Sequence, residues 1–387
     1  MSSKVLILGA GLIGRPMALD LLQQRDFEVG IADHSPSRLK ALAQTNAKTY
    51  CCDLSDKNSW AHIAANYDYF INAVPGFLGY ETLKTLIVFG KPIVDIAFYP
   101  EDPLALQSMA KESGAVVVCD MGVAPGMSHL LSGNAAAELA CLHKLLIYVG
   151  GLPVERNLPW QYKAVFSPDD VIEEYTRPAR IVENGKIVLK EALSDSEYID
   201  IKPIGTLEAF NSDGLRTLVH TLKADFMAEK TLRYPGHVDL IKALKMSGFF
   251  STNTIKGRSE SFVPLELTKA VLFDQWKLQP GEADLTVMRI IAEGQKYDGT
   301  QWRIRYDLFD TADQNTGIHS MARTTGYAAA SALRMIKAGL LTQSGIYMPE
   351  IIGQNNEIVG FMLNEQQKRE IHYEKTVERL RSEIINE

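Results

Sequence analysis

Short apolar runs alternate with segments of helical spacing over the first third of the chain. "KVLILGAG" is an apolar run that ends in glycines, and "RPMALDLLQQ" then places apolar residues at helical intervals. The alternation continues through "FEVGIADHS", "PSRLKALAQT", "DYFINAVPG", "ETLKTLIVFG", "KPIVDIAF" and "AVVVCDMG". Apolar strands separated by helices predict an α/β fold, with a doubly wound parallel sheet covered by helices on both faces.

The pattern changes after "GVAPGMSHLLSGNAAAEL". From Lys144 onward the strand-like segments are longer and alternate, as in "KLLIYVGGLP", "ARIVENGKIVLKEAL" and "TVMRIIAEGQKYDGTQWRIRYDLFD". The Asn-Gly of "ENGK" and the Asp-Gly of "KYDGTQ" are typical of tight hairpins. We therefore expect a separate α+β domain with a mixed, mostly antiparallel sheet over residues 123–319.

Two helical segments are predicted after this domain. "SMARTTGYAAASALRMIKAG" is rich in small residues and suits close packing, so we expect a segment of about 320–365 to return to the first domain, residues 1–122. In the tail, Tyr373, Val377, Leu380 and Ile384 fall on one helical stripe, which predicts a C-terminal helix within 366–387.

Composition limits the class of protein. A chain of 387 residues is long enough for two domains, and 46% hydrophobic and 22% charged residues are typical of globular proteins. The formal net charge of -7 argues against a nucleic-acid binder. No signal peptide and no apolar stretch of bilayer length is recognisable, so we expect a cytoplasmic protein without membrane contact. The four cysteines have no metal-ligand spacing, and no metal site is predicted.

"GAGLIG" has the GxGxxG spacing of a dinucleotide-binding loop between a predicted strand and a predicted helix. Gly9 would permit the tight turn, Gly11 would let the backbone approach a pyrophosphate, and Gly14 would let helix and strand pack closely. Asp33 ends the second strand, where a carboxylate binds ribose hydroxyls and repels a 2′-phosphate. This favours NAD over NADP, although Arg38 lies close in sequence.

Ligands of doubly wound sheets lie beyond the carboxyl ends of the strands. Asp53 would lie near the adenine, or would cap a helix instead. Phe98, with Phe77 and Tyr99, would form an apolar wall near the nicotinamide, or these strand-end residues would pack only against each other. The cofactor-binding residues predicted in this way are Gly9, Ala10, Gly11, Leu12, Ile13, Gly14, Asp33, Asp53, Leu54, Val74, Pro75, Asp95 and Gly122.

Several longer motifs resemble the saccharopine dehydrogenase (reductase)-like family. "LGAGLIGRPMALDLL", "NAVPGFLGYE", "DMGVAPGMSHLL", "FSPDDVIEEYTRPARIVENGK", "EAFNSDGLRTL" and "KTLRYPGH" occur in the family's order, and within it they look most similar to the L-lysine 6-dehydrogenases. The resemblance implies a Rossmann domain with an inserted substrate-binding and dimerisation domain, and a homodimer. It also implies NAD-dependent oxidative deamination of lysine at the ε-carbon, giving 2-aminoadipate 6-semialdehyde, which cyclises to a piperideine carboxylate, and ammonia.

Two positions depart from the saccharopine reductases that this chain resembles. Those proteins carry an aspartate where this chain has Ala124 and an arginine where it has Ser212, and both residues handle the larger, triply carboxylated substrate. Their absence favours a smaller amino acid such as lysine. The alternatives are an oxidoreductase acting on a secondary amine, such as saccharopine or carboxynorspermidine, and a non-catalytic protein that senses NAD.

Oxidation of an amine requires a nitrogen with a free lone pair, so an ε-ammonium with a pKa near 10.4 must first lose its proton. "EKTLRYPGH" offers Arg233 and Thr231 for the α-carboxylate of a substrate, and His237 for proton transfer or substrate orientation. The alternative is that this Pro-Gly turn is a solvated surface loop. The resemblance also places the Thr-Leu-Arg of this motif against substrate.

Weaker catalytic candidates are Lys163 and Tyr175. Lys163 would be a base if burial lowered its pKa, although an exposed strand lysine is the usual case. Tyr175 lies in a cluster with Arg177 and Arg180, which surface salt bridges explain more often than catalysis does. Asn211 and Asp213 would bind substrate, or would cap a helix that begins near Leu215.

Overall fold

The computed structural model describes residues 3–258 and 260–380. Contacts divide the chain into two compact units. The first unit contains the described residues up to Ala137 together with Ala322–His372, and the second contains Glu138–Met321 and the described residues from Tyr373 onward. The first domain therefore extends beyond residue 122, and the chain returns to it after Met321.

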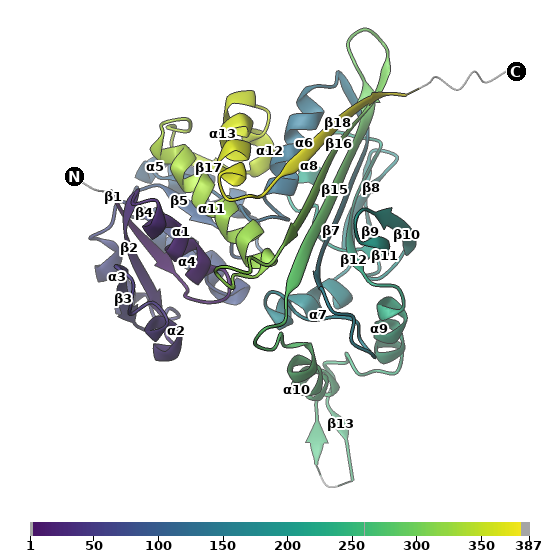
Figure 1. Ribbon diagram of the computed structural model, residues 1–387, viewed down its shortest axis with the longest axis horizontal. Helices are drawn as coiled ribbons and strands as arrows, with labels where there is room; N and C mark the ends of the chain where they lie inside the picture. The colour runs from purple at the N-terminus through teal and green to yellow at the C-terminus, as the bar shows by residue number, and fades with distance from the viewer. Residues whose placement is uncertain (1–2, 259, 381–387) are drawn as a thin grey trace, which may run out of the picture. The chain divides into compact units, whose positions relative to one another are not determined.

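The first unit is built on a seven-stranded parallel sheet (Figure 1). The strand order is β17-β6-β5-β4-β1-β2-β3, in which every pair is parallel. The strands are β1 (Ser3–Leu8), β2 (Phe27–Asp33), β3 (Lys48–Cys51), β4 (Tyr69–Asn72), β5 (Ile93–Asp95), β6 (Val116–Val118) and β17 (Gly345–Tyr347). Apolar strands flanked by helices give the doubly wound α/β fold that the sequence predicts.

Helices cover both faces of this sheet. On one face, a single apolar core joins α3 (Lys57–Ala64), α4 (Gly76–Ile87) and α5 (Gln107–Ser113) to the strands. On the other face, Gly14 of α1 (Gly14–Gln23) lies close to Ile7, and Gly326 of α11 (Ser320–Lys337) lies close to Met17 of α1. The remaining helices of the unit are α2 (Pro36–Lys40), η1 (Pro103–Leu106), α6 (Met127–Ala137), α12 (Pro349–Ile352) and α13 (Asn356–Gln367).

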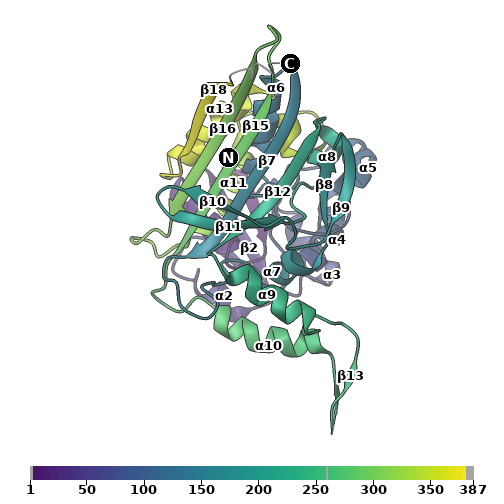
Figure 2. The same ribbon diagram turned by 90° about the vertical axis from the view of Figure 1, so that its right-hand side faces the viewer.

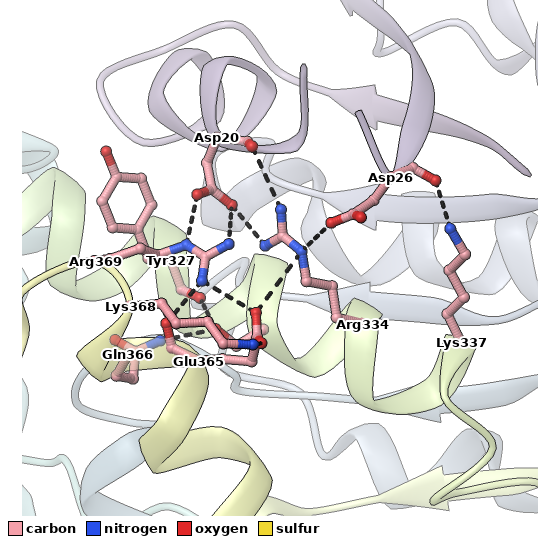
Figure 3. Close-up of polar contacts among 10 residues, drawn as sticks. Asp20, Asp26, Tyr327, Arg334, Lys337, Glu365, Gln366, Lys368 and Arg369 are labelled. Atoms are coloured by element: carbon pink, nitrogen blue, oxygen red, sulfur yellow. Dashed lines mark hydrogen bonds and ion pairs between the residues drawn. The ribbon is translucent and has the colours of Figure 1, made fainter. Parts of the chain in front are cut away.

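A buried ionic network joins the returning segment to α1. Figure 3 shows the carboxylate of Asp20 between the guanidinium groups of Arg334 and Arg369, with Glu365 on their other side. Arg334 Nη1 lies 2.6 Å from Asp20 Oδ2, and Arg369 Nη1 lies 3.1 Å from Glu365 Oε2. All four side chains are less than 10% exposed. Because breaking a buried ion pair leaves an uncompensated charge, the network links the late helices specifically to the early part of the chain.

The second unit contains a nine-stranded mixed sheet. Its main order is β10-β11-β12-β7-β15-β16-β18, and β8 pairs with both β12 and β9. Only β12 and β7 are parallel among the described pairs of this sheet. The strands are β7 (Cys141–Pro153), β8 (Ala179–Glu183), β9 (Lys186–Lys190), β10 (Glu197–Ile201), β11 (Gly205–Asn211), β12 (Phe226–Arg233), β15 (Asp284–Gln295), β16 (Gln301–Thr311) and β18 (Tyr373–Arg379).

Both predicted hairpins are present. Asn184 and Gly185 join β8 to β9 with φ values of 51° and 70°, the left-handed conformation that a two-residue turn requires. Gly299 has φ 83° in the turn between β15 and β16. The mixed sheet of the second unit thus agrees with the α+β domain expected from the sequence.

A satellite core lies beside the large sheet of the second unit. It joins α7 (Pro168–Thr176), α9 (His237–Met246) and α10 (Pro264–Trp276) to the strands through buried aromatic and aliphatic side chains. In Figure 2, α9 and α10 lie next to each other, and the small hairpin of β13 (Ile255–Lys256) and β14 (Ser261–Phe262) projects beyond them. The remaining helix is α8 (Leu218–Thr221).

The predicted C-terminal helix over 366–387 is wrong for its described part. Helix α13 ends at Gln367, and Tyr373–Arg379 forms β18, which pairs antiparallel with β16. The edge of β16 offers unpaired backbone N–H and C=O groups to a further strand. Thr376 and Val377 are β-branched residues, which favour a strand. Val377 is 41% exposed, so the apolar stripe was no sign of a packed helix face. Ile384, the last member of that stripe, lies outside the described residues.

Candidate functional site

The glycine loop of the first unit has the geometry of a dinucleotide-binding turn. Gly9 has φ 108°, and a Cβ there would lie 2.4 Å from the carbonyl oxygen of Ala73. A Cβ at Gly14 would lie 1.9 Å from the carbonyl oxygen of Gly9. A Cβ at Gly11 would meet nothing within 4 Å. Gly9 and Gly14 are therefore required by close packing, whereas Gly11 leaves open space beside the backbone, where a pyrophosphate fits.

The other loop residues lie at the start of α1. Ala10 is buried, Leu12 is 58% exposed, and Ile13 is the residue that precedes the helix. The first N–H groups of a helix have no partners within the helix and carry a partial positive charge, which suits a phosphate.

Asp33 connects the glycine loop to the end of β2. Its Oδ2 accepts the N–H of Ala10 at 2.7 Å and its Oδ1 accepts the N–H of Ser35 at 2.8 Å. The guanidinium of Arg38 lies 3.6 Å from Oδ2, and its side chain is 52% exposed. Asp33 thus holds the loop in shape and places its carboxylate where a ribose is expected, with a cation next to it.

Asp53 and Leu54 follow β3. Asp53 is exposed, and its Oδ1 accepts both the N–H and the hydroxyl of Ser55, which holds the pKa of Asp53 below its usual value. The side chain that caps α3 is Asp56. Asp53 therefore does not cap that helix, and its placement near an adenine stays a prediction, as does that of the buried Leu54.

The predicted residues after β4, β5 and β6 lie at the carboxyl ends of their strands. Val74 is buried, Pro75 directly precedes α4, and Gly122 donates its N–H to the carbonyl of Pro125. Asp95 is fully buried, and it accepts the N–H of Ala97 and the hydroxyl of Tyr99, each at 2.9 Å. Asp95 therefore shapes the segment after β5.

The apolar wall of Phe77, Phe98 and Tyr99 is not formed as predicted. Tyr99 is 1% exposed and belongs to the core of the first unit. Phe77 is 85% exposed on α4, and Phe98 is half-buried. Phe98 stays a candidate for substrate contact, but Tyr99 does not share a surface with it.

In the second unit, Arg233 lies at the end of β12 and is only 1% exposed. Its Nη2 lies 2.6 Å from Glu174 Oε2, its Nε donates to the hydroxyl of Tyr175 at 3.1 Å, and its Nη1 donates to the carbonyl of Leu232 at 2.9 Å. The guanidinium also stacks 4.5 Å from the centroid of the Tyr162 ring. The predicted carboxylate-binding cation is therefore inside the protein and already paired.

His237 continues this network as a neutral acceptor. Its Nδ1 lies 2.8 Å from the carbonyl of Trp160, which only accepts, so Nδ1 carries the proton. Its Nε2 lies 2.9 Å from the hydroxyl of Tyr175, which therefore donates to it. Burial and the charge of Arg233 lower the pKa of His237 to about 3, and burial raises that of Tyr175 to about 12. Neither group exchanges protons readily near neutral pH.

Lys163 is engaged by other partners. Its Nζ donates to the carbonyl of Lys277 at 3.2 Å and lies 3.4 Å from a carboxylate oxygen of Glu282. An ion pair favours the charged ammonium, whereas a base needs the neutral amine. The geometry therefore gives Lys163 the surroundings of an ion-paired cation, and its role as a base stays a prediction.

Asn211 and Asp213 do not cap a helix. Helix α8 begins at Leu218, preceded by Thr217. Both carboxylate oxygens of Asp213 accept from the guanidinium of Arg180, at 2.8 and 3.0 Å, so its charge is already compensated. The side-chain amide of Asn211 donates to Ser194 and Asp195. Both residues stabilise the connections around β11.

Thr231 and Glu229 share the face of β12 that carries Arg233, because side chains two apart point to the same side of a strand. Thr231 Oγ1 donates to Ser212 Oγ at 2.8 Å. Glu229 is 5% exposed and was not among the predicted site residues. The alternation of Glu229, Thr231 and Arg233 within one strand could have indicated it, because it places the Glu229 carboxyl group on the same face as the two predicted substrate-binding residues.

Some site types find no support in the described part of the chain. Among its residues, no group of three or more His, Cys, Asp or Glu side chains has the geometry to hold a metal ion. No helix within the described ranges is long and apolar enough to span a membrane.

Two family models together match most of the chain. The model for the saccharopine dehydrogenase NADP binding domain matches residues 5–118, and the model for the saccharopine dehydrogenase C-terminal domain matches residues 122–371.

Similar proteins agree with these matches. A saccharopine dehydrogenase [NADP(+), L-glutamate-forming] of Schizosaccharomyces pombe is 22% identical to this chain, and the alignment covers 99% of each protein. The structure of the apo L-Glu-forming saccharopine dehydrogenase of Saccharomyces cerevisiae superposes with a TM-score of 0.81 at 20% identity, over 97% of this chain and 100% of that one. The structure of the homospermidine synthase of Legionella pneumophila in complex with NAD superposes with a TM-score of 0.66 at 14% identity, over 100% of this chain and 94% of that one. The two structures show that the fold is shared.

Proposed function

The chain belongs to the saccharopine dehydrogenase family, and from this premise we propose that it is an NAD(P)-dependent oxidoreductase that acts on a carbon–nitrogen bond of a lysine-derived amine. The observation that carries the proposal is the glycine loop, in which Gly11 leaves open space beside the backbone and Asp33 closes the turn. When bound, a nicotinamide cofactor supplies the hydride acceptor. The residues of this chain must then bind the amine, orient it and remove its proton.

The names of the relatives support a secondary amine as the substrate. The similar proteins of both yeasts are named saccharopine dehydrogenases, and saccharopine carries its reactive nitrogen between two amino-acid carbons. This is the substrate class best supported by the comparisons.

A second candidate is L-lysine itself, oxidised at its ε-carbon. It is favoured by Ser212, which is buried and bonded to Thr231 where a saccharopine reductase would carry an arginine. Arg233 and Arg180 are already paired with Glu174 and Asp213. With Arg233 and Arg180 engaged in this way, this part of the second unit suits a substrate with fewer carboxylates.

For the cofactor we propose NAD. A carboxylate at the end of β2 binds ribose hydroxyls and repels a 2′-phosphate, and Asp33 is in that position. The neighbouring Arg38 would instead favour NADP, since a guanidinium pairs well with phosphate.

One assay tests the class and separates the candidates. The purified chain is incubated at alkaline pH with NAD or NADP and, separately, with L-lysine, L-ornithine, saccharopine and carboxynorspermidine, and reduced cofactor is followed by absorbance. We expect reduction with saccharopine or lysine. Ammonia among the products identifies the primary amine as substrate, and glutamate identifies saccharopine. Tight cofactor binding without turnover of any amine would contradict the proposal.

A further inference from the structure

The carboxyl group of Glu229 is the least compensated buried acid on the face of β12 that carries Arg233. The residue is 5% exposed, and its Oε2 has no hydrogen-bond partner among the described residues. Gly214 packs directly over it, since a Cβ there would lie 1.5 Å from Glu229 Oε1. A buried carboxyl oxygen without a partner is costly, so such a group calls for an explanation.

The charged groups around Glu229 come from two segments of the chain. Glu174 approaches from α7, and Asp213 and Arg216 from the connection between β11 and α8. Burial, and then the negative charges of Glu174 and Asp213, raise the pKa of Glu229 to about 8, and Arg216 opposes this shift. Glu229 thus differs from its acidic neighbours Glu174 and Asp213, whose carboxylates are held by Arg233 and Arg180.

The other proton acceptors suggested by the sequence are engaged. Nε2 of His237 accepts from Tyr175, and the ammonium of Lys163 is bound by Glu282 and a backbone carbonyl. The reaction nevertheless requires a base, because an ammonium carries no lone pair to assist loss of hydride from the adjacent carbon.

We infer that Glu229 is the substrate-side base: its carboxylate binds the ammonium of the amine substrate and accepts one proton from it. The step converts R–CH2–NH3⁺ and the Glu229 carboxylate into R–CH2–NH2 and the Glu229 carboxylic acid, and a secondary ammonium behaves in the same way. The free amine then has the lone pair that loss of hydride from the adjacent carbon requires. This inference rests on the proposed function.

The pH dependence of kcat/KM in Glu229→Gln tests the inference, with saccharopine or lysine, whichever the wild type turns over. The wild-type rate should rise with pH through the pKa of Glu229, about 8, because only the ionised carboxylate accepts a proton. In Glu229→Gln the rise should move toward the pKa of the free substrate ammonium, about 10.4 for a lysine amine. At pH 8 to 9 we expect kcat/KM to fall by about 100-fold, the usual effect of removing a general base.

Glu208→Gln is the matched control, because Glu208 is a buried acid of the adjacent strand β11 whose Oε2 accepts the N–H of Gly236. Glu208→Gln should keep the wild-type rise of kcat/KM with pH, and Glu229→Asp should restore part of that rise. Turnover by Glu229→Gln with the same pH dependence of kcat/KM as the wild type would overturn this inference and leave the proposed function standing. Absence of turnover in the wild type with every amine would remove both.

The melting temperature gives a second readout that needs no turnover. The unfolded Glu229 ionises near pH 4.5 and the folded one near 8, so its burial destabilises the wild type increasingly as pH rises between these values. The gain in melting temperature of Glu229→Gln over the wild type should therefore grow from pH 6 to pH 8 and change little above pH 8. A difference that does not change with pH would show that Glu229 does not titrate in this range, and would overturn the inference.

Discussion

The guanidinium of Arg233 holds together a buried group of aromatic and acidic side chains. It is bonded to Glu174 and to Tyr175, and it lies 4.5 Å from the ring centroid of Tyr162. Tyr175 in turn donates to His237. Removing one partner of such a network leaves charges and donors buried without compensation, which costs more than the interaction itself contributes.

Arg233→Ala should therefore act first on stability. We expect a loss on the order of 3–5 kcal/mol in the free energy of unfolding, because the Glu174 carboxylate loses its cation. Urea denaturation measures this loss. The control is Arg156→Ala. The exposed guanidinium of Arg156 lies 4.4 Å from the centroid of the Tyr234 ring, so its removal should lower the free energy of unfolding by about 1 kcal/mol or less. Equal effects of the two substitutions would contradict the structural role of Arg233.

At the residue scale, the sequence indicated the right strand but not the state of its side chains. "EKTLRYPGH" could be chosen for its charged and titratable residues, yet the pairing of Arg233 depends on Glu174, far away in sequence. The neutrality of His237 likewise depends on a carbonyl at Trp160. The protonation states of these side chains depend on partners that lie outside the motif, so the residues of the motif alone do not predict them.

The glycine loop is the element whose residues were predicted most completely. Its spacing is local, and each glycine answers a backbone requirement that is visible in sequence: a turn, an open approach and a helix–strand contact. The hairpins at Asn184 and Gly299 are local in the same way. Strand β18 was missed because its pairing with β16 is a non-local interaction that overrides a weak helical stripe.

Two alanine substitutions in this loop should separate folding from cofactor binding. Gly14→Ala places a Cβ 1.9 Å from a carbonyl oxygen, so it should lower the melting temperature strongly. Gly11→Ala meets no protein atom within 4 Å, so it should keep the melting temperature within a few degrees yet weaken NAD(P) binding by about tenfold or more, because the methyl group occupies the pyrophosphate approach. Calorimetric titration with NAD and NADP measures the second effect. Wild-type affinity in Gly11→Ala would show that the pyrophosphate binds elsewhere.

At the scale of the whole molecule, the division into a parallel-sheet unit and a mixed-sheet unit was predictable because the hydrophobic period changes along the chain. The return of the chain to the first unit was expected from the small residues of the segment of about 320–365, but the charges that link this segment to α1 follow no local pattern. Arg334 and Arg369 both bind Asp20, more than 300 residues away in sequence. Such a buried network is specified by three distant segments together, so only the structure reveals it.

We propose that hydride moves from the carbon beside the substrate nitrogen to the nicotinamide cofactor, and an isotope-transfer experiment follows this step. The chain is incubated with oxidised cofactor and either L-lysine or saccharopine deuterated at the carbon of the bond to be oxidised, and the reduced cofactor is analysed by mass spectrometry. We expect the reduced cofactor to gain one deuterium from the substrate that is turned over. Reduced cofactor without deuterium, or no reduction with either amine, would contradict it.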